Sequence, residues 1–317
     1  MFKRFFVPVI LFLIVAMALS GCSGSEEADD GQKKVAVLFP FLIDDGAWNE
    51  EGYKGLLEAE KEGIKIAYTE QVRQAEQIEV FRNYAQEGYD VIIGHGGEYM
   101  QAALTVAKEF PETLFVVTNG TEVADNVSCV TFNFEHRGFV AGAFAGLMTE
   151  TGKVAEITGE EIPVISDQKR GFEAGLKYVN PEAEFRFIIT GSWDDVEIGR
   201  EATIAFIESG GDVILNNLDS GEIGLFSAAE DYGAMVIGQY IDQTHLGPNC
   251  HIGSGAASPG ILVYHAATME QEGGKIIALG AAEGGVNMSA FSDKVPEEVR
   301  EKVLQIQQDL GEGKIQF

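Results

Sequence analysis

The sequence predicts an α/β protein with two doubly wound parallel-sheet lobes, a hinge and a ligand cleft between the lobes. From residue 34 onward, short apolar runs alternate with helical patterns, which is the signature of βαβ units. The alternation restarts near residue 153, as if the first arrangement were repeated. A chain of 317 residues is also longer than one hydrophobic core usually serves.

The first lobe is expected to contain five strands and the helices that join them. The strands are predicted at Val35–Phe39, Ile64–Tyr68, Val91–Gly94, Leu114–Thr118 and Val127–Phe132, and the helices over 47–62, 74–88 and 98–109. A helix from Glu135 to Thr149 follows, with Gly138, Gly142 and Gly146 along one line. Because it has polar residues at its start and no long apolar span, we expect it to pack closely against a sheet and to begin the crossing into the second lobe.

The second lobe repeats this order. Its strands are predicted at Lys153–Ile157, Phe185–Thr190, Val213–Asn216 and Met235–Gly238, and its helices over 166–178, 195–209 and 221–233. A helix over about 259–272 and strands near 276–279 and 285–287 must return to one of the sheets. Pro296–Gly311 is predicted as an amphipathic helix, and Gly313–Phe317 resembles the start of another strand, so we expect the sequence to be truncated there.

The N-terminus has the pattern of a secretory signal peptide. Lys3 and Arg4 precede an apolar run from Phe5 to Leu19, which is too short to span a bilayer comfortably. The run ends in Leu19-Ser20-Gly21-Cys22, which resembles a bacterial lipobox, where the cysteine is acylated and becomes the first mature residue. An ordinary signal peptide that happens to contain a cysteine is the alternative.

The predicted organisation is therefore a signal peptide over 1–22, a flexible tether over 23–34, lobe one over 35–134, lobe two over 135–242 and return crossings to both lobes over 243–317. We expect a monomer that is exported and anchored by lipid to the bacterial cell membrane. The net charge of −28 repels phosphates, so nucleic acid is excluded as a direct partner. Cys129 is predicted in a buried strand and Cys250 in a loop, and the sequence does not establish whether they pair.

Motifs for catalysis and cofactors are weak. Gly253–Ser258 only half resembles a dinucleotide fingerprint, and no phosphate-binding GxxxxGK[ST] loop is present. Ala256–Gly260 resembles a nucleophile elbow, but Pro259 lacks the N–H that an oxyanion hole would need. The histidines form no pair at metal-binding helical spacing. We therefore expect no enzyme, no cofactor and no metal site.

Two tryptophans occupy equivalent turns of the two lobes. Trp48, followed by Asn49, opens the first helix after the first strand, and Trp193 lies between a strand and a helix of lobe two. In open α/β sheets ligands bind beyond the carboxyl ends of the strands. Two facing indoles can hold a flat ligand, with a stack of roughly 1–3 kcal/mol per face. The alternative is that both are core residues. Asp44 and Asp45 are expected to cap the helix that presents Trp48.

Three further residues are candidates for polar contacts with the ligand. His95 follows a strand within a glycine-rich turn, and Asp219 and Asp242 each follow a strand of lobe two. A carboxylate there can accept hydrogen bonds from a neutral polar ligand. The alternatives are a loop histidine or metal ligand for His95, and helix caps or turn residues for the two aspartates.

Several motifs together resemble the Bmp (basic membrane lipoprotein) family. They are the lipobox, the DDGAWNEEGYKG segment at 44–55, FRNYAQEGYDVIIG at 81–94, RGFVAG at 137–142 with TGKV at 151–154, and the run from GSWDD at 191–195 through AAE at 228–230. The resemblance covers nearly the whole mature chain. It implies a type I periplasmic-binding-protein fold and a substrate-binding lipoprotein that serves the permease subunits of an ABC importer. Characterised members bind mainly purine nucleosides.

The family's residues carry over in part. Trp48 before Asn49 and Trp193 after Ser192 match the two aromatics that stack on the base. Phe39 stands where an acidic residue is common in the nucleoside binders, and only Asp242 and Gln243 match a five-residue motif. The family's ribose-binding lysine is missing, since its position aligns near Ile261. The expected ligand is therefore a purine base or nucleoside, or another flat polar molecule. A ligand sensor that signals to a membrane partner and a nucleoside hydrolase are the alternatives, and a neighbouring gene for a kinase would favour sensing.

Overall fold

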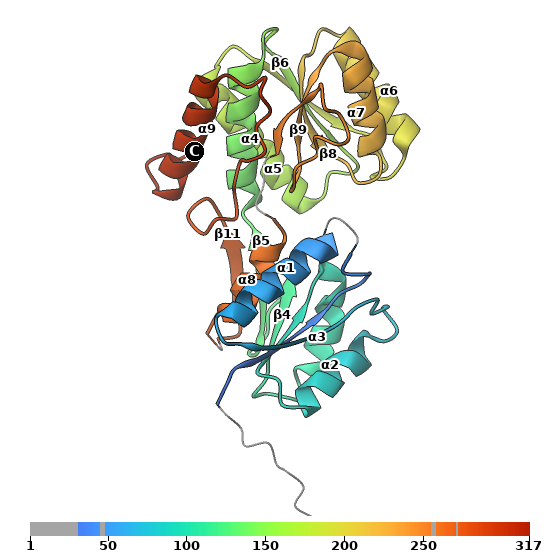
Figure 1. Ribbon diagram of the computed structural model, residues 1–317, viewed down its shortest axis with the longest axis vertical. Coiled ribbons are helices and arrows are strands. Elements are labelled where there is room, and N and C mark those ends of the chain that lie inside the picture. The colour runs from blue at the N-terminus through green and yellow to red at the C-terminus, as the bar shows by residue number, and fades with distance from the viewer. Residues whose placement is uncertain (1–30, 45–47, 255–257, 271) are drawn as a thin grey trace, which may run out of the picture. The chain divides into compact units, whose positions relative to one another are not determined.

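The computed structural model describes residues 31–317 except 45–47, 255–257 and 271. The chain divides into the units Met1–Gln32 and Lys33–Phe317, and every named helix and strand lies in the second. Its named strands form two sheets in which every pairing between neighbouring strands is parallel, and helices cover the faces of both (Figure 1).

The first sheet has six strands in the order β11-β5-β4-β3-β1-β2. They are β1 (Lys34–Leu38), β2 (Lys65–Thr69), β3 (Val91–Gly94), β4 (Leu114–Thr118), β5 (Val127–Phe132) and β11 (Ile276–Leu279). Alternate residues of β1 enter different cores: Val35 and Val37 pack with α1 (Trp48–Lys61) and α8 (Gly260–Thr268), which lie side by side. The opposite face packs with α2 (Gln77–Gln86), η1 (Gly97–Tyr99) and α3 (Met100–Val106).

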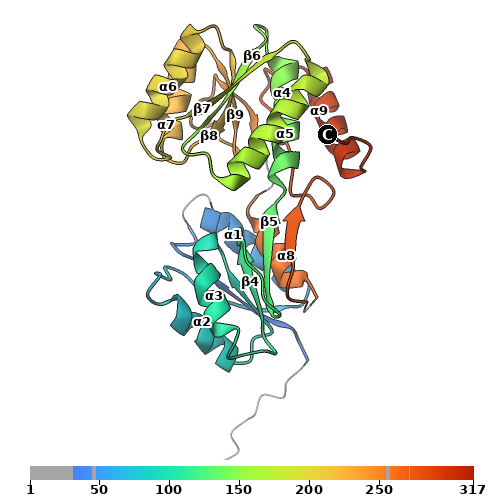
Figure 2. The same ribbon diagram turned by 180° about the vertical axis from the view of Figure 1, so that it is seen from behind.

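The second sheet has five strands in the order β10-β9-β8-β6-β7. They are β6 (Lys153–Thr158), β7 (Glu184–Ile189), β8 (Val213–Asn217), β9 (Met235–Gly238) and β10 (His251–Ser254). One face is covered by α4 (Phe134–Met148) and α5 (Pro163–Val179), with α9 (Glu297–Gly311) beside α4 (Figure 2). The other face is covered by α6 (Val196–Glu208) and α7 (Glu222–Tyr232).

The chain passes between the two sheets more than once. It leaves the first sheet from β5 into α4, returns from β10 to α8 and β11, and crosses again to α9. Because all strands are parallel, the loops at the carboxyl ends of each sheet are the ones that connect to helices and that bind ligands in such folds. The described helices include none with the length and apolar character needed to span a bilayer.

Most predicted elements are present, with ends that differ by a few residues, but one strand was missed and two expectations are wrong. The strand β10 was not predicted, because its sequence has a single large apolar residue. These residues form a strand by pairing with β9. Residues 285–287 form no strand; nearby, Ser289 makes only an isolated bridge with Ser254. Residues 314–317 also form no strand, and Phe317 instead stacks on Phe139 with ring centroids 4.5 Å apart.

The glycines of α4 allow close packing, as predicted, but the partner in direct contact is the helix α5. A Cβ added at Gly138 or Gly142 would lie 2.0 Å from a carbonyl oxygen of α5. The contact is reciprocal, since a Cβ at Gly171 or Gly175 of α5 would lie 2.0 or 1.9 Å from a carbonyl oxygen of α4. The two helix backbones therefore touch, which fixes how α5 sits against the start of the second lobe.

The two cysteines of the described chain are both buried and free. Cys129 lies in the core beneath α2 and α3, and Cys250 lies in the core beneath α6 and α7. The side chains thus belong to separate hydrophobic clusters. Burial raises the pKa of the Cys129 thiol to about 11, so it is a thiol at neutral pH.

We predict that Gly142→Ala lowers the free energy of unfolding by about 1–3 kcal/mol, because the added methyl group has no space between α4 and α5. Urea denaturation monitored by circular dichroism measures the change. Glu173→Ala, at an exposed position of α5, is the matched control and should have little effect. Equal stability of Gly142→Ala and the wild type would contradict the packing argument.

Candidate functional site

A cavity of about 860 Å³ lies at the carboxyl ends of strands from both sheets. The first lobe contributes residues that follow β1, β3 and β4, and the second contributes residues that follow β8 and β9. Its volume falls in the range of small-molecule sites, about 300–1,000 Å³. Of the predicted site residues, Trp48, Asn49 and Asp219 line this cavity.

The indole of Trp48 is fixed by His95. The two rings stack with centroids 4.5 Å apart and an interplanar angle of 11°. Trp48 Nε1 donates to the His95 carbonyl at 3.3 Å, and His95 Nε2 lies 3.0 Å from the Trp48 carbonyl oxygen. His95 itself is fully buried, with Nδ1 3.2 Å from Thr118 Oγ1. His95 therefore supports one face of Trp48, and its side chain is not among the described cavity-lining groups.

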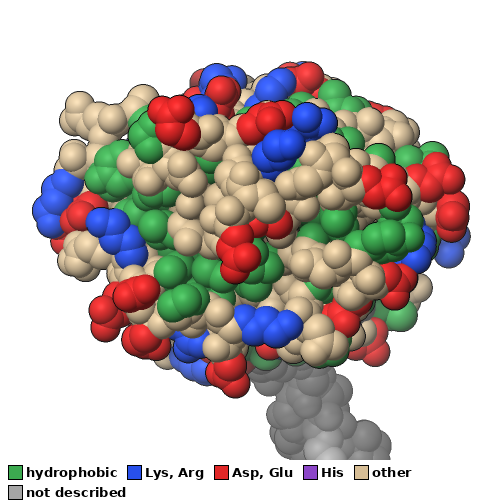
Figure 3. Space-filling view, turned by 90° about the horizontal axis from the view of Figure 1, so that it is seen from above, with side chains coloured by type: hydrophobic (Ala, Val, Ile, Leu, Met, Phe, Trp, Pro, Cys, Tyr) green, Lys and Arg blue, Asp and Glu red, His purple; other side chains and the backbone are tan. Residues whose placement is uncertain are grey.

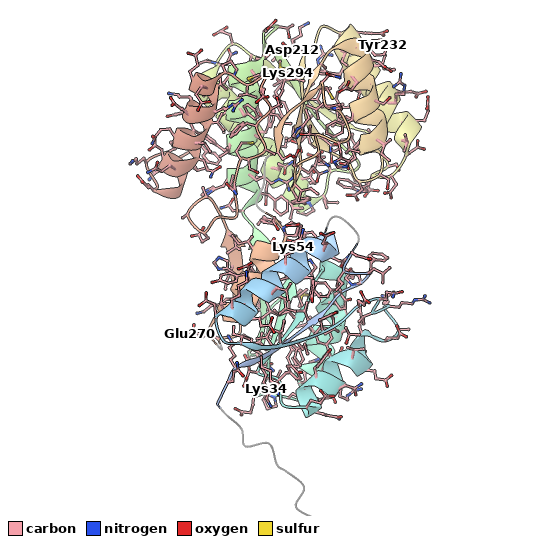
Figure 4. All side chains as sticks on the ribbon, viewed as in Figure 1. Lys34, Lys54, Asp212, Tyr232, Glu270 and Lys294 are labelled. Carbon is pink, nitrogen blue, oxygen red and sulfur yellow. The ribbon has the colours of Figure 1, made fainter. Side chains whose placement is uncertain are left out.

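The space for this stack is provided by a glycine one turn into α1. A Cβ at Gly52 would lie 2.5 Å from His95 Nε2, so a larger residue there would displace the imidazole. Side-chain contacts of Glu51 also stabilise the first turn of α1. Glu51 accepts a hydrogen bond from Ser258, which precedes α8, and pairs with Lys54 at 2.7 Å. Lys54 is labelled on α1 in Figure 4. These contacts position the start of the helix that presents Trp48.

Tyr240 forms a second aromatic wall that the sequence reasoning missed. Its ring packs edge-on to Trp48 at 6.2 Å and lies 5.9 Å from Phe132, and it lines the cavity. The guanidinium carbon of Arg137 lies over the same ring, 4.5 Å from its centroid. The available signal was position, because Tyr240 follows the predicted strand that ends at Gly238 and is two residues before the selected Asp242.

Carboxyl groups give the cavity an acidic character. Burial raises the pKa of Glu98, Asp219 and Glu222, and nearby Asp194 raises that of Asp219 further. Glu222 Oε2 accepts hydrogen bonds from Asn216 at 2.8 Å and Gln243 at 2.7 Å. Among the described lining residues there is no lysine or arginine. The cavity therefore favours a neutral or cationic ligand that donates hydrogen bonds.

Trp193 and Asp242 are not among the described lining residues. The Trp193 indole packs on Gly159, where a Cβ would lie 2.4 Å from the ring. Its carbonyl accepts hydrogen bonds from the N–H groups of Asp219 and Gly221, both at 3.0 Å, so Trp193 holds the turn that carries Asp219. The two-indole sandwich stays a prediction.

Asp242 lies in a turn near a buried histidine. Its side chain is 64% exposed and accepts hydrogen bonds from the backbone N–H and the hydroxyl of Thr244, at 2.9 and 2.5 Å. These bonds hold the pKa of Asp242 below its usual range. The carboxylate also lies 3.9 Å from His251 Nδ1. Asp44, expected to cap α1, is exposed, and Asp45 lies outside the described residues.

A buried polar cluster lies beneath the carboxyl end of β6. Glu156 is fully buried, and its Oε1 accepts hydrogen bonds from Gln168 at 2.7 Å and Asn217 at 3.1 Å. Burial raises the pKa of Glu156 to about 7, although these hydrogen bonds and the charge of Arg137 oppose the shift. The sequence offered one signal, a lone carboxylate between apolar residues of a predicted strand.

Comparison with known proteins identifies the family. The profile described as "Bmp: ABC transporter substrate-binding protein PnrA-like" matches residues 32–316. The chain belongs to the Bmp family. Among curated relatives, Transcriptional activator protein med of Bacillus subtilis is 32% identical over 243 residues, covering 76% of this chain and 75% of that protein. Basic membrane protein A2 of Borrelia garinii is 25% identical over 307 residues, covering 93% and 91%.

Solved structures show the same fold. An ABC transporter solute-binding protein from Conexibacter woesei superposes with a TM-score of 0.72 at 23% identity, covering 90% of this chain and 98% of that one. A transcriptional activator of the comK gene from Bacillus halodurans superposes with a TM-score of 0.74 at 25% identity, covering 89% and 99%. The expected type I periplasmic-binding-protein fold is confirmed.

As a Bmp-family chain, the protein is a substrate-binding protein of an ABC transporter, of a family that acts outside the cytoplasm. Solute-binding proteins of this type are generally not enzymes, and nothing in the comparisons indicates catalysis. Within the described part of the Bmp chain, no group of three or more His, Cys, Asp or Glu side chains is placed to hold a metal ion.

The buried carboxyl of Glu156 predicts a specific pH dependence of stability. The folded chain keeps this proton up to about pH 7, whereas the unfolded chain releases it near the ordinary pKa of 4.5. Between these values the folded state binds more protons, so the free energy of unfolding falls as the pH rises. A pKa that is 4.5 in the unfolded chain and about 7 in the folded chain corresponds to a loss of about 3 kcal/mol in the free energy of unfolding.

We therefore expect that the free energy of unfolding of Glu156→Gln does not fall in this way. The variant should become more stable relative to the wild type as the pH rises from 4.5 to 7. Urea unfolding across that range measures it, with Glu182→Gln, at an exposed position, as the control. Stability curves of Glu156→Gln and the wild type that run parallel would contradict the prediction.

Proposed function

We propose that this protein binds a purine base or nucleoside in the cavity and delivers it to the permease of an ABC importer. The supporting observation is Trp48, whose indole is fixed on buried His95 at the wall of an 860 Å³ cavity. A fixed indole offers a flat ring a stacking surface without the entropy cost of ordering a mobile side chain.

The polar groups around Trp48 suit the same ligand. Asp219 and Glu222 are acceptors for N–H groups of a base or hydroxyls of a ribose, and the amide residue Asn49 also lines the cavity. The absence of lysine and arginine from the described lining disfavours nucleotides, whose phosphates would be repelled by the carboxylates of the cavity. A neutral base or nucleoside is thus favoured over a nucleotide.

The role of Trp48 is testable by Trp48→Ala, which should weaken purine nucleoside binding by roughly 5- to 150-fold, the equivalent of losing one base stack. Isothermal titration calorimetry with guanosine, inosine and adenosine measures it. Trp193→Ala tests the second half of the predicted sandwich, and undiminished binding by this variant would exclude Trp193 from the stack. Tyr178→Ala, which removes an exposed aromatic from α5, is the control.

The purine proposal fails if the wild-type protein binds no purine base or nucleoside while a sugar or an amino acid binds tightly. It also fails if Trp48→Ala binds purines as tightly as Tyr178→Ala does. In the cell, deletion of the gene should abolish purine uptake without altering the growth on other carbon or nitrogen sources.

We further propose that Cys22 carries the lipid that anchors the protein. Cys22 lies outside the described residues, and the support is the Leu-Ser-Gly-Cys sequence after an apolar run. Cys22→Ala should move the protein from the membrane fraction and prevent incorporation of labelled fatty acid, whereas Ser25→Ala in the predicted tether should behave as the wild type. Retention of labelled fatty acid by Cys22→Ala would exclude this anchor.

A ligand sensor is the second candidate, because two relatives are named transcriptional activators. A net charge of −28 disfavours direct contact with DNA, and acidic and basic side chains are interspersed on the face seen in Figure 3. A sensor of this kind would therefore act through a protein partner. Sensing is favoured if gene deletion changes transcription but leaves purine uptake intact.

A further inference from the structure

Glu222 is the carboxyl group of the described cavity lining that neighbouring side chains hold in a fixed orientation. It is the first residue of α7, where the helix dipole favours a negative charge, and it is partly buried. Asn216 Nδ2 and Gln243 Nε2 both donate to its Oε2, at 2.8 and 2.7 Å. Glu98 and Asp219 also line the cavity, but they are exposed and accept no hydrogen bond from a side chain that the structure describes. Glu222 is therefore the preorganised carboxyl group of the three.

Backbone N–H groups determine which way the two amides point. The N–H of Leu218 donates to Asn216 Oδ1 at 3.2 Å. The N–H of Gln239 donates in the same way to Gln243 Oε1 at 2.9 Å. Because a backbone N–H can only donate, these two atoms are the amide oxygens, and the amide nitrogens face Glu222. The orientation of Glu222 thus follows from the backbone of the turns after β8 and β9.

This arrangement leaves Oε1 of Glu222 for a ligand. Oε1 accepts no hydrogen bond from the residues that the structure describes, and Glu222 lines the cavity. The two N–H donors on Oε2 stabilise the ionised carboxyl, although burial raises its pKa. An ionised carboxyl group is an acceptor only. A ligand group that meets Oε1 must therefore be a hydrogen-bond donor.

The ligand of the proposed function carries such donors in two places. A 6-oxopurine base has an N–H group at N1, and a ribose has hydroxyl groups. Both sources offer the same chemistry, a neutral donor that the carboxylate can accept. A site built around an oriented acceptor rejects an analogue that lacks the donor, because the buried acceptor is then left unpaired.

We propose that Glu222 is a specificity-determining residue of the cavity and that its Oε1 accepts a hydrogen bond from the bound ligand. This inference rests on the proposed function, which is that the cavity binds a purine base or nucleoside. It adds to that function one required donor on the ligand and the single protein atom that recognises it.

The variant Glu222→Gln should reverse the polarity of this position. Because the two amide nitrogens need an acceptor, the new side chain must turn its oxygen toward them and its NH₂ group toward the cavity. Inosine binding should weaken by about 10- to 150-fold, the range for one hydrogen bond to a charged group. The loss should be larger if the donor is the base N–H, which cannot accept, than if it is a hydroxyl, which can.

Isothermal titration calorimetry on the full chain in detergent measures this loss, at pH 8, which favours the ionised carboxyl. Glu208→Gln is the matched control, because it makes the same substitution at an exposed position at the end of α6. This control should bind inosine as the wild type does.

Analogues of inosine distinguish the two donors on the wild type alone, so that misfolding of a variant cannot decide the result. 1-Methylinosine lacks the N–H group at N1, and the 2′-, 3′- and 5′-deoxy analogues each lack one hydroxyl. The analogue that lacks the recognised donor should bind the wild type about 10- to 150-fold more weakly than inosine does. On Glu222→Gln the same analogue should bind as tightly as inosine, because that variant has already lost the hydrogen bond.

Two results would overturn the role of Glu222 while purine binding stays intact. One is equal binding of inosine by Glu222→Gln and Glu208→Gln, and the other is equal binding of inosine and all its analogues by the wild type. If the wild type binds no purine base or nucleoside, the proposed function itself is overturned, and the two failures are thereby distinguished.

Discussion

The stack of Trp48 on His95 is the contact that gives the cavity a fixed surface for a flat ligand. An exposed indole at the first turn of a helix would otherwise sample several rotamers, and each would have to be ordered on binding. The stack and its two hydrogen bonds to backbone groups remove that freedom in advance. It depends on Gly52, which leaves room for the imidazole, and on Thr118, which lies within hydrogen-bond distance of its other nitrogen. Residues from α1, β3 and β4 thus cooperate in one wall.

The second lobe contributes buried polar groups of both signs. Glu156 is held by Gln168 and Asn217, and Arg137 lies on the ring of Tyr240. Burying these groups costs free energy that an apolar core would not. They lie near the carboxyl ends of the second sheet, which is where ligands bind in this architecture.

Close contact between helix backbones gives these polar groups a rigid support. Gly138 and Gly142 of α4 and Gly171 and Gly175 of α5 let the two helices touch along their length. Arg137 and Gln168 stand in this same helix pair, so their positions follow from the packing. Such a contact holds the polar groups at fixed distances from one another.

Local sequence determined most of the elements and the topology class. The apolar runs at β3, β4, β5 and β9 have the predicted bounds, because a fully buried parallel strand is marked by its composition alone. The family followed from several motifs that were readable without structure. The sequence also predicted the cavity-lining residues Trp48, Asn49 and Asp219. Each follows a strand, and ligands bind at the carboxyl ends of the strands in a parallel sheet.

Tertiary structure decided what each selected side chain faces. His95 and Trp193 occupy turns that look equivalent to those of lining residues, yet one is buried beneath Trp48 and the other packs on Gly159. Tyr240 and Arg137 meet only because the fold brings together segments about a hundred residues apart in the sequence. Residues 251–254 form the strand β10 because they pair with β9. Burial, stacking and pairing of this kind arise from contacts distant in sequence, so they are properties of the folded chain.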